Sequence, residues 1–261
     1  MPFLIKPWSL PRSVPVFRVE PDPPPFIERA RREPYPLCYP WDNDVEVPAD
    51  AFPTSAREVN AFRVLPDFLS LKYWPAVSAE FRAFAANETS PVTQWLRALA
   101  KLAHRECGGA GVGAIGMCFT GNFALTMMLE PAMLAPVLSQ PSLPLREPAG
   151  LEIAPEELAA VRARLDREDL TVLAYRFKGD KICRAERFSA YAAALGDRFI
   201  GRELPDEAAN NDVSPFFARH VPFPHSVVTQ HLIDQAGQPT SAARDEIITF
   251  FRTRLAPAAV A

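Results

Sequence analysis

The chain has 261 residues, of which 48% are hydrophobic, and its formal net charge at pH 7 is −3. This length and apolar content are sufficient for a full hydrophobic core. The slightly acidic balance offers no basic field that would attract nucleic acid. No apolar run approaches the about 18 residues of a membrane-spanning helix, and a lysine and a proline interrupt the apolar part of residues 1–13. We therefore expect no signal peptide, no membrane contact and a cytoplasmic location.

The four cysteines form no CxxC pair and have no histidine at a spacing suited to zinc; they are Cys38, Cys107, Cys118 and Cys183. We expect reduced thiols and no bound metal. The letters "GVGAIG" at 111–116 lie inside an apolar run, and no acidic residue follows about 20 positions later, so we interpret this match to a dinucleotide-binding pattern as chance. No cofactor is expected.

Glycine and proline divide the chain into two parts. All 11 glycines lie at or after Gly108, whereas 15 of the 28 prolines lie before residue 87. Proline interrupts every short apolar run in the first part, and proline cannot donate a hydrogen bond to a sheet. We predict an irregular, extended or poorly ordered region over residues 1–75, followed by a folded domain over residues 76–261.

Helical and strand-like patterns alternate through the second part. Ser90 and Pro91 resemble an N-cap and a first helical residue, and Gly108 would end that helix. The patterns predict helices over about 92–107, 121–129, 155–165, 185–195 and 240–255, and strands over 112–115, 133–139, 170–177 and 199–204. Such alternation indicates an α/β fold, with a mostly parallel sheet and helices on both faces.

The most unusual stretch is "VGAIGMCFTGNFALTMM" at 112–128, where Cys118 lies between Gly116 and Gly121 at the predicted strand-to-helix corner. Gly-x-Cys-x-x-Gly in this place has the layout of a nucleophile elbow, whose small neighbours let strand and helix approach. A helix starting near Phe119 would favour a thiolate, and the backbone N–H of Phe119 would bind an oxyanion. A buried structural cysteine before a tight turn is the alternative.

A catalytic thiolate needs a base and an acid that orients the base. On an elbow scaffold both follow the nucleophile, first the acid and then the histidine. Asp180 lies in the turn after the third predicted strand, and His225 is the candidate base among the three histidines that follow the last strand. An ordinary turn aspartate and a solvated loop histidine are the alternatives.

These residues lie within a resemblance. The segments "NETSPVTQWL" at 87–96, "GAIGMCFTGNFAL" at 113–125, "APVLSQPSLP" at 135–144, "RFKGDKICRAERF" at 176–188 and "PHSVVTQHLID" at 224–234 resemble, in the same order, the dienelactone hydrolase family of α/β hydrolases. The resemblance covers about residues 76–261. It implies a Cys118–His225–Asp180 triad that cleaves small esters or lactones, which often carry a carboxylate.

The chain departs from the family pattern in two places. Thr120 stands where the family usually has glycine, and no histidine precedes His104, so the family's N-terminal His-Glu-x-x-Gly turn, the source of a second oxyanion donor, is missing. Arg82 and Arg176 are candidates to hold a substrate carboxylate, with a surface or structural role as the alternative. A thioesterase or peptidase on the same scaffold, or a non-catalytic relative, therefore remains open, and a homodimer is possible.

Overall fold

The computed structural model describes residue 82 and residues 84–255, with no description of the Phe216 side chain. The chain divides into two units, Met1–Ala79 and Glu80–Ala261. The expected irregular region over residues 1–75 lies outside the described residues and stays a prediction. Everything below concerns the second unit.

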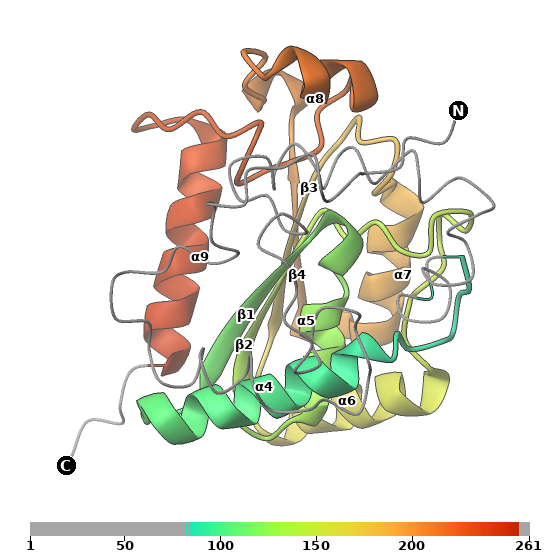
Figure 1. Ribbon diagram of the computed structural model, residues 1–261, viewed down its shortest axis with the longest axis vertical. Helices are drawn as coiled ribbons and strands as arrows, with labels where there is room; N and C mark the ends of the chain where they lie inside the picture. Colours follow the sequence, from blue (N-terminus) through green and yellow to red (C-terminus); the bar gives the residue numbers. More distant parts are fainter. Residues whose placement is uncertain (1–81, 83, 256–261) are drawn as a thin grey trace, which may run out of the picture. The chain divides into compact units, whose positions relative to one another are not determined.

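The described residues contain one sheet of four parallel strands in the order β1-β2-β3-β4 (Figure 1). The strands are β1 (Val112–Met117), β2 (Met133–Ser139), β3 (Val172–Phe177) and β4 (Phe199–Leu204). Met117 pairs with Ser139 and Ser139 with Tyr175, so the carboxyl ends of β1, β2 and β3 lie level at one edge. The prediction of an α/β fold with a parallel sheet is confirmed.

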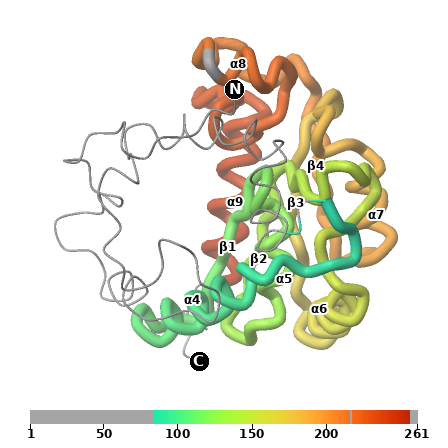
Figure 2. The backbone as a smooth tube through the Cα atoms, turned by 45° about the vertical axis from the view of Figure 1, so that its right-hand side comes forward, coloured from blue at the N-terminus to red at the C-terminus, as the bar shows by residue number. Residues whose placement is uncertain are grey.

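Helices cover both faces of this sheet. The α-helices of the described residues are α4 (Val92–Cys107), α5 (Phe123–Thr126), α6 (Pro155–Arg167), α7 (Ala185–Leu195), α8 (Pro215–His220) and α9 (Pro239–Leu255); α8 lies beyond the ends of the strands (Figure 1). α9 packs on β1 and β2 from one side, while α5 lies against β2 and α7 against β4 from the other (Figures 1 and 2).

Alternate residues of the central strands divide the core between the two faces. On β2, Leu138 belongs to the cluster beneath α5, α6 and α7, and Val137 to the cluster beneath α9. On β3, Ala174 belongs to the cluster beneath α5, α6 and α7, and Tyr175 to the cluster beneath α9. All four side chains are buried, as expected for parallel strands that are covered on both faces.

Most predicted elements are confirmed, and three details are wrong. The segment expected as one helix over 121–129 has only the four residues of α5 as α-helix, followed by the 3₁₀ turn Met127–Leu129. The side chain of Ser90 does not cap α4, which begins after Pro91 without a side-chain cap. The short helix α8 was not predicted. In the described part of the chain, no helix has both the length and the apolar character needed to cross a membrane.

Candidate active site

Cys118 lies at a sharp corner where β1 ends. Met117 is still extended, with φ −129° and ψ 136°, but Cys118 has a φ of +54°. This left-handed conformation costs a non-glycine residue roughly 1–2 kcal/mol. Cys118 then begins the 3₁₀ turn Cys118–Thr120. A strained residue held at a strand-to-helix corner is the backbone geometry of a nucleophile elbow.

The two glycines around the corner allow a very close backbone approach. A Cβ atom on Gly116 would lie 2.1 Å from the carbonyl oxygen of Thr120, and a Cβ atom on Gly121 would lie 2.3 Å from the Cα atom of Pro141. Because both obstacles are backbone atoms, a side chain at either position would force the corner to move. The expectation that these positions must be small therefore has a geometric basis.

Thr120 keeps the corner closed from its outer side. Its hydroxyl donates to the carbonyl oxygen of Met117 at 3.0 Å and accepts from the N–H of Met117 at 3.1 Å. The residue is exposed, so its β-branched side chain does not enter the space between strand and helix. The elbow therefore accommodates threonine where the resembled family usually has glycine.

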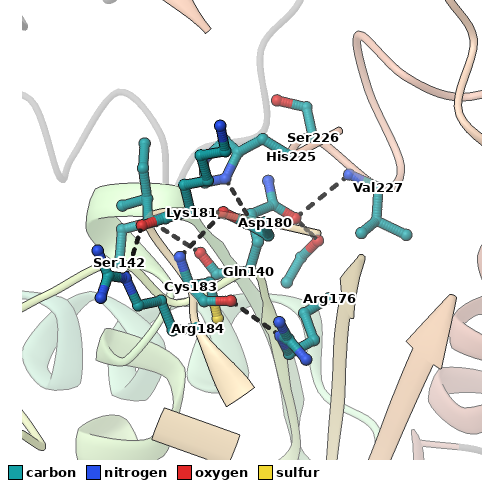
Figure 3. Close-up of polar contacts among 12 residues, drawn as sticks. Gln140, Ser142, Arg176, Asp180, Lys181, Cys183, Arg184, His225, Ser226 and Val227 are labelled. Carbon is teal, nitrogen blue, oxygen red and sulfur yellow. Dashed lines mark hydrogen bonds and ion pairs between the residues drawn. The ribbon is translucent and has the colours of Figure 1, made fainter. Parts of the chain in front are cut away.

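Asp180 and His225 form a buried pair at the same edge of the sheet (Figure 3). Oδ2 of Asp180 lies 2.7 Å from Nδ1 of His225, and the side chains are 0% and 1% exposed. The other carboxylate oxygen accepts from the backbone N–H groups of Ile182 at 2.9 Å and Cys183 at 3.0 Å. These bonds hold the carboxylate in one orientation, which in turn orients the imidazole ring.

The imidazole of His225 acts electrostatically on the thiol of Cys118. Nε2 of His225 is buried and has no hydrogen-bond partner of ordinary geometry among the described residues. Burial alone would raise the pKa of Cys118, but the charge of His225 lowers that pKa below its ordinary value. Burial likewise opposes a charged ring, yet Asp180 and Cys118 raise the pKa of His225 to about 10. Each group therefore favours the charged form of the other, thiolate and imidazolium.

Two further groups stabilise the thiolate. The hydroxyl of Ser142, whose one proton can go either to the sulfur or to the carbonyl oxygen of Gln140, and the backbone N–H of Phe119 also lower the pKa of Cys118. The contact with Phe119 places this N–H beside the sulfur, where the sequence analysis expected an oxyanion donor. Ser142 was missed, because it lies in the loop after β2 and no motif marks it. Its backbone N–H donates to the carbonyl oxygen of Cys118 at 2.9 Å, which brings the loop over the corner.

A second cysteine close to this site behaves in the opposite way. Cys183 is fully buried, and burial together with the nearby charge of Asp180 raises the pKa of its thiol. Its side chain therefore stays protonated, while its backbone holds Asp180. Cys118, in contrast, is only partly buried as a residue.

The two arginines suggested for substrate binding differ in their contacts. Arg176 is 1% exposed; its guanidinium donates to the carbonyl oxygen of Cys183 (Figure 3). It also donates to the carbonyl oxygen of Lys178 and pairs with Glu203 at 3.0 Å. These bonds occupy the guanidinium and favour a structural role for Arg176, and its contact with a substrate stays a prediction. Arg82 forms an ion pair with Glu88 at 3.3 Å, and its contact with a substrate stays a prediction.

Within residues 82 and 84–255, no group of three His, Cys, Asp or Glu side chains could hold a metal ion. The segment in which the resembled family carries its second oxyanion donor precedes residue 82 and lies outside this range. Comparisons with protein-family models, curated proteins and solved structures gave no match to the chain. The site's own geometry is therefore the basis for a functional proposal.

Proposed function

We propose that the chain is a carboxylic ester hydrolase of the dienelactone hydrolase type, built on an α/β-hydrolase scaffold. The observation that carries the proposal is the buried 2.7 Å pair of Asp180 and His225, whose imidazole lowers the pKa of a thiol held at a strained elbow. Nucleophile, orienting acid and base follow β1, β3 and β4, respectively, in the chain order of such hydrolases.

The proposed reaction begins with attack of the Cys118 thiolate on the carbonyl carbon of an ester or lactone. The carbonyl π electrons move onto oxygen, and the resulting oxyanion accepts from the N–H of Phe119. When the C–O bond breaks, the leaving alkoxide takes the proton from Nε2 of His225. A thioester on Cys118 and a neutral imidazole remain.

Water then completes the cycle. His225 accepts a proton from water as the water oxygen attacks the thioester carbonyl, and the C–S bond breaks to give the carboxylic acid and the thiolate. Asp180 stabilises the imidazolium in both half-reactions. Each step uses side chains of the chain and needs no metal or cofactor. The expected partner is a small-molecule ester or lactone.

The test is turnover of p-nitrophenyl acetate and of a dienelactone by the full chain. Cys118→Ala is expected to abolish turnover of both compounds, and the native protein should carry an acyl group on Cys118 after brief exposure. Cys107→Ala is the matched control, because that thiol is exposed and lies at the end of α4. Undiminished hydrolysis by folded Cys118→Ala would refute the proposed mechanism.

A further inference from the structure

The loop that carries the candidate base is tied down through three consecutive backbone N–H groups. His225, Ser226 and Val227 follow β4, outside any helix or strand, and all three are buried. A loop at this place could otherwise take several positions, because no sheet partner fixes it. Two side chains from different parts of the chain accept from its N–H groups.

The first acceptor is His231. Its Nδ1 atom accepts from the N–H of His225 at 3.1 Å and from the N–H of Ser226 at 3.0 Å. The backbone N–H of His231 donates back to the carbonyl oxygen of Ser226 at 3.0 Å. Since both partners of Nδ1 are donors, this nitrogen carries no proton. His231 therefore holds the loop as a neutral ring.

The surroundings of His231 keep the ring neutral and in place. The residue is 4% exposed, and its ring packs edge-on against Phe177 and Phe217, with centroid distances of 6.0 Å and 5.1 Å. Burial and the nearby charge of His225 lower the pKa of His231 to about 4, against the opposing effect of Asp180. The nitrogen thus remains an acceptor while His225 is charged.

The second acceptor is Gln140, which follows β2. Its side-chain oxygen accepts from the N–H of Val227 at 3.3 Å (Figure 3). Gln140 is 1% exposed and has a φ of +37°, a conformation that glutamine adopts at a cost. Its carbonyl oxygen accepts from the hydroxyl of Ser142, the residue whose side chain also contacts the sulfur of Cys118. The same short loop therefore contacts both the nucleophile and the segment that carries the base.

We propose that His231 and Gln140 are positioning residues that fix the imidazole of His225 at the thiol of Cys118 by accepting from the N–H groups of residues 225–227. The proposal rests on the proposed function for the roles of Cys118 and His225. It adds that the ion pair between the Cys118 thiolate and the His225 imidazolium depends on a hydrogen-bond acceptor at each end of residues 225–227. Loss of either acceptor shifts the base relative to the thiol, and a displacement of about 1 Å is enough to cost on the order of 10²-fold in rate.

The test compares variants that keep the shape of a side chain and either keep or remove its acceptor. His231→Phe keeps an aromatic ring and removes Nδ1, whereas His231→Asn keeps an acceptor near the Nδ1 position. Gln140→Met removes the other acceptor with little change in length. Far-ultraviolet circular dichroism and thermal unfolding establish which variants are folded.

The readout is the pH dependence of alkylation of Cys118 by iodoacetamide in the full chain, followed at the level of the Cys118 peptide by mass spectrometry. We expect His231→Phe and Gln140→Met to raise the pH midpoint of alkylation and to slow the reaction at pH values below it by on the order of tenfold, because less thiolate is present. His231→Asn should restore most of the native profile. A fall in kcat with little change in KM should accompany the shift.

An unchanged alkylation profile in folded His231→Phe would overturn the proposal, as would an equal shift in His231→Asn, since packing of the ring would then explain the effect. If His231→Phe does not fold, Gln140→Met decides, because its hydrogen bond lies at the other end of the segment. Alkylation does not require ester turnover. An inactive protein whose profile shifts as expected would therefore count against the proposed function and leave the positioning role supported.

Discussion

Replacing Asp180 with asparagine tests how much of the charge of His225 depends on one carboxylate. The native site raises the pKa of His225 from 6.5 to about 10, with burial opposing the charge and Asp180 first among the groups that favour it. At about 1.4 kcal/mol per pH unit, this difference corresponds to about 5 kcal/mol in favour of the imidazolium. Asp180→Asn removes the negative charge and nearly preserves the size of the side chain.

The expected result is a change in the alkaline limb of the pH–rate profile. In the proposed mechanism the imidazolium protonates the leaving alkoxide, so kcat/KM of the native protein for an alkyl ester should fall as pH rises through about 10. In Asp180→Asn this limb should move to lower pH, towards the ordinary value of 6.5. The maximal rate should fall by about 10²- to 10⁴-fold, as for loss of the orienting acid in other triads.

The assay is steady-state hydrolysis of an alkyl ester across the pH range in which the protein stays folded. Asp206→Asn is the matched control, because Oδ1 of Asp206 accepts from the N–H of Gly179, next to Asp180, at 2.7 Å and Asp206 is not among the groups that set the pKa of His225. An alkaline limb that remains near pH 10 in folded Asp180→Asn would refute the assigned role of the carboxylate.

Three further predictions concern the corner and its support. Gly121→Ala should reduce kcat at least tenfold and destabilise the fold by about 1–3 kcal/mol, since its Cβ would lie 2.3 Å from Pro141 Cα; urea unfolding and ester hydrolysis measure both effects, and a native-like variant would contradict the close packing. Cys118→Gly should be more stable than Cys118→Ala by about 1 kcal/mol, because φ at this position is +54°; equal stability in urea would argue against backbone strain. Burial raises the pKa of Glu152 to about 8, although hydrogen bonds from Ser90 and Asn122 oppose the rise. The stability that this group contributes in its neutral form is therefore present below about pH 4.5 and lost as pH rises towards 8. Glu152→Gln should accordingly unfold at higher temperature than the native protein at pH 8 and above. If the difference in unfolding temperature between the two proteins is the same at acidic and at alkaline pH, the result would count against a buried charge at Glu152.

The sequence predicted the helices and strands whose apolar patterns follow from burial of one helix face or of both faces of a strand. The bounds of β2, α7 and β4 agree with the expected ranges, because each apolar run is set off by turn residues or a change of period. Asp180 was predicted from its place after a strand, and His225 from the chain order of the elbow scaffold and the family resemblance; the structure brings the two side chains together.

The details that the sequence did not predict depend on contacts between distant residues. An apolar run such as 121–129 buries the same side chains in an α-helix and in 3₁₀ turns, so its pattern does not distinguish them. Around the break, Asn122 accepts from the hydroxyl of Tyr191 at 2.7 Å and donates to the backbone of Glu152. The contacts of Arg176 were likewise not predicted, because its guanidinium donates to carbonyl oxygens of a loop, which have no sequence signature.

The break in the helix changes the explanation of the thiolate. A helix dipole acts through aligned peptide units, and a 3₁₀ turn of three residues, an α-helix of four and the 3₁₀ turn Met127–Leu129 follow the sulfur of Cys118 in place of one regular α-helix. The lowered pKa of Cys118 is accordingly attributed to His225, Ser142 and the N–H of Phe119. Of these, the imidazole belongs to a loop distant in sequence, so thiolate formation requires tertiary structure that the elbow alone does not supply. Local unfolding of residues 225–231 should therefore turn the nucleophile into an ordinary thiol while the sheet remains intact.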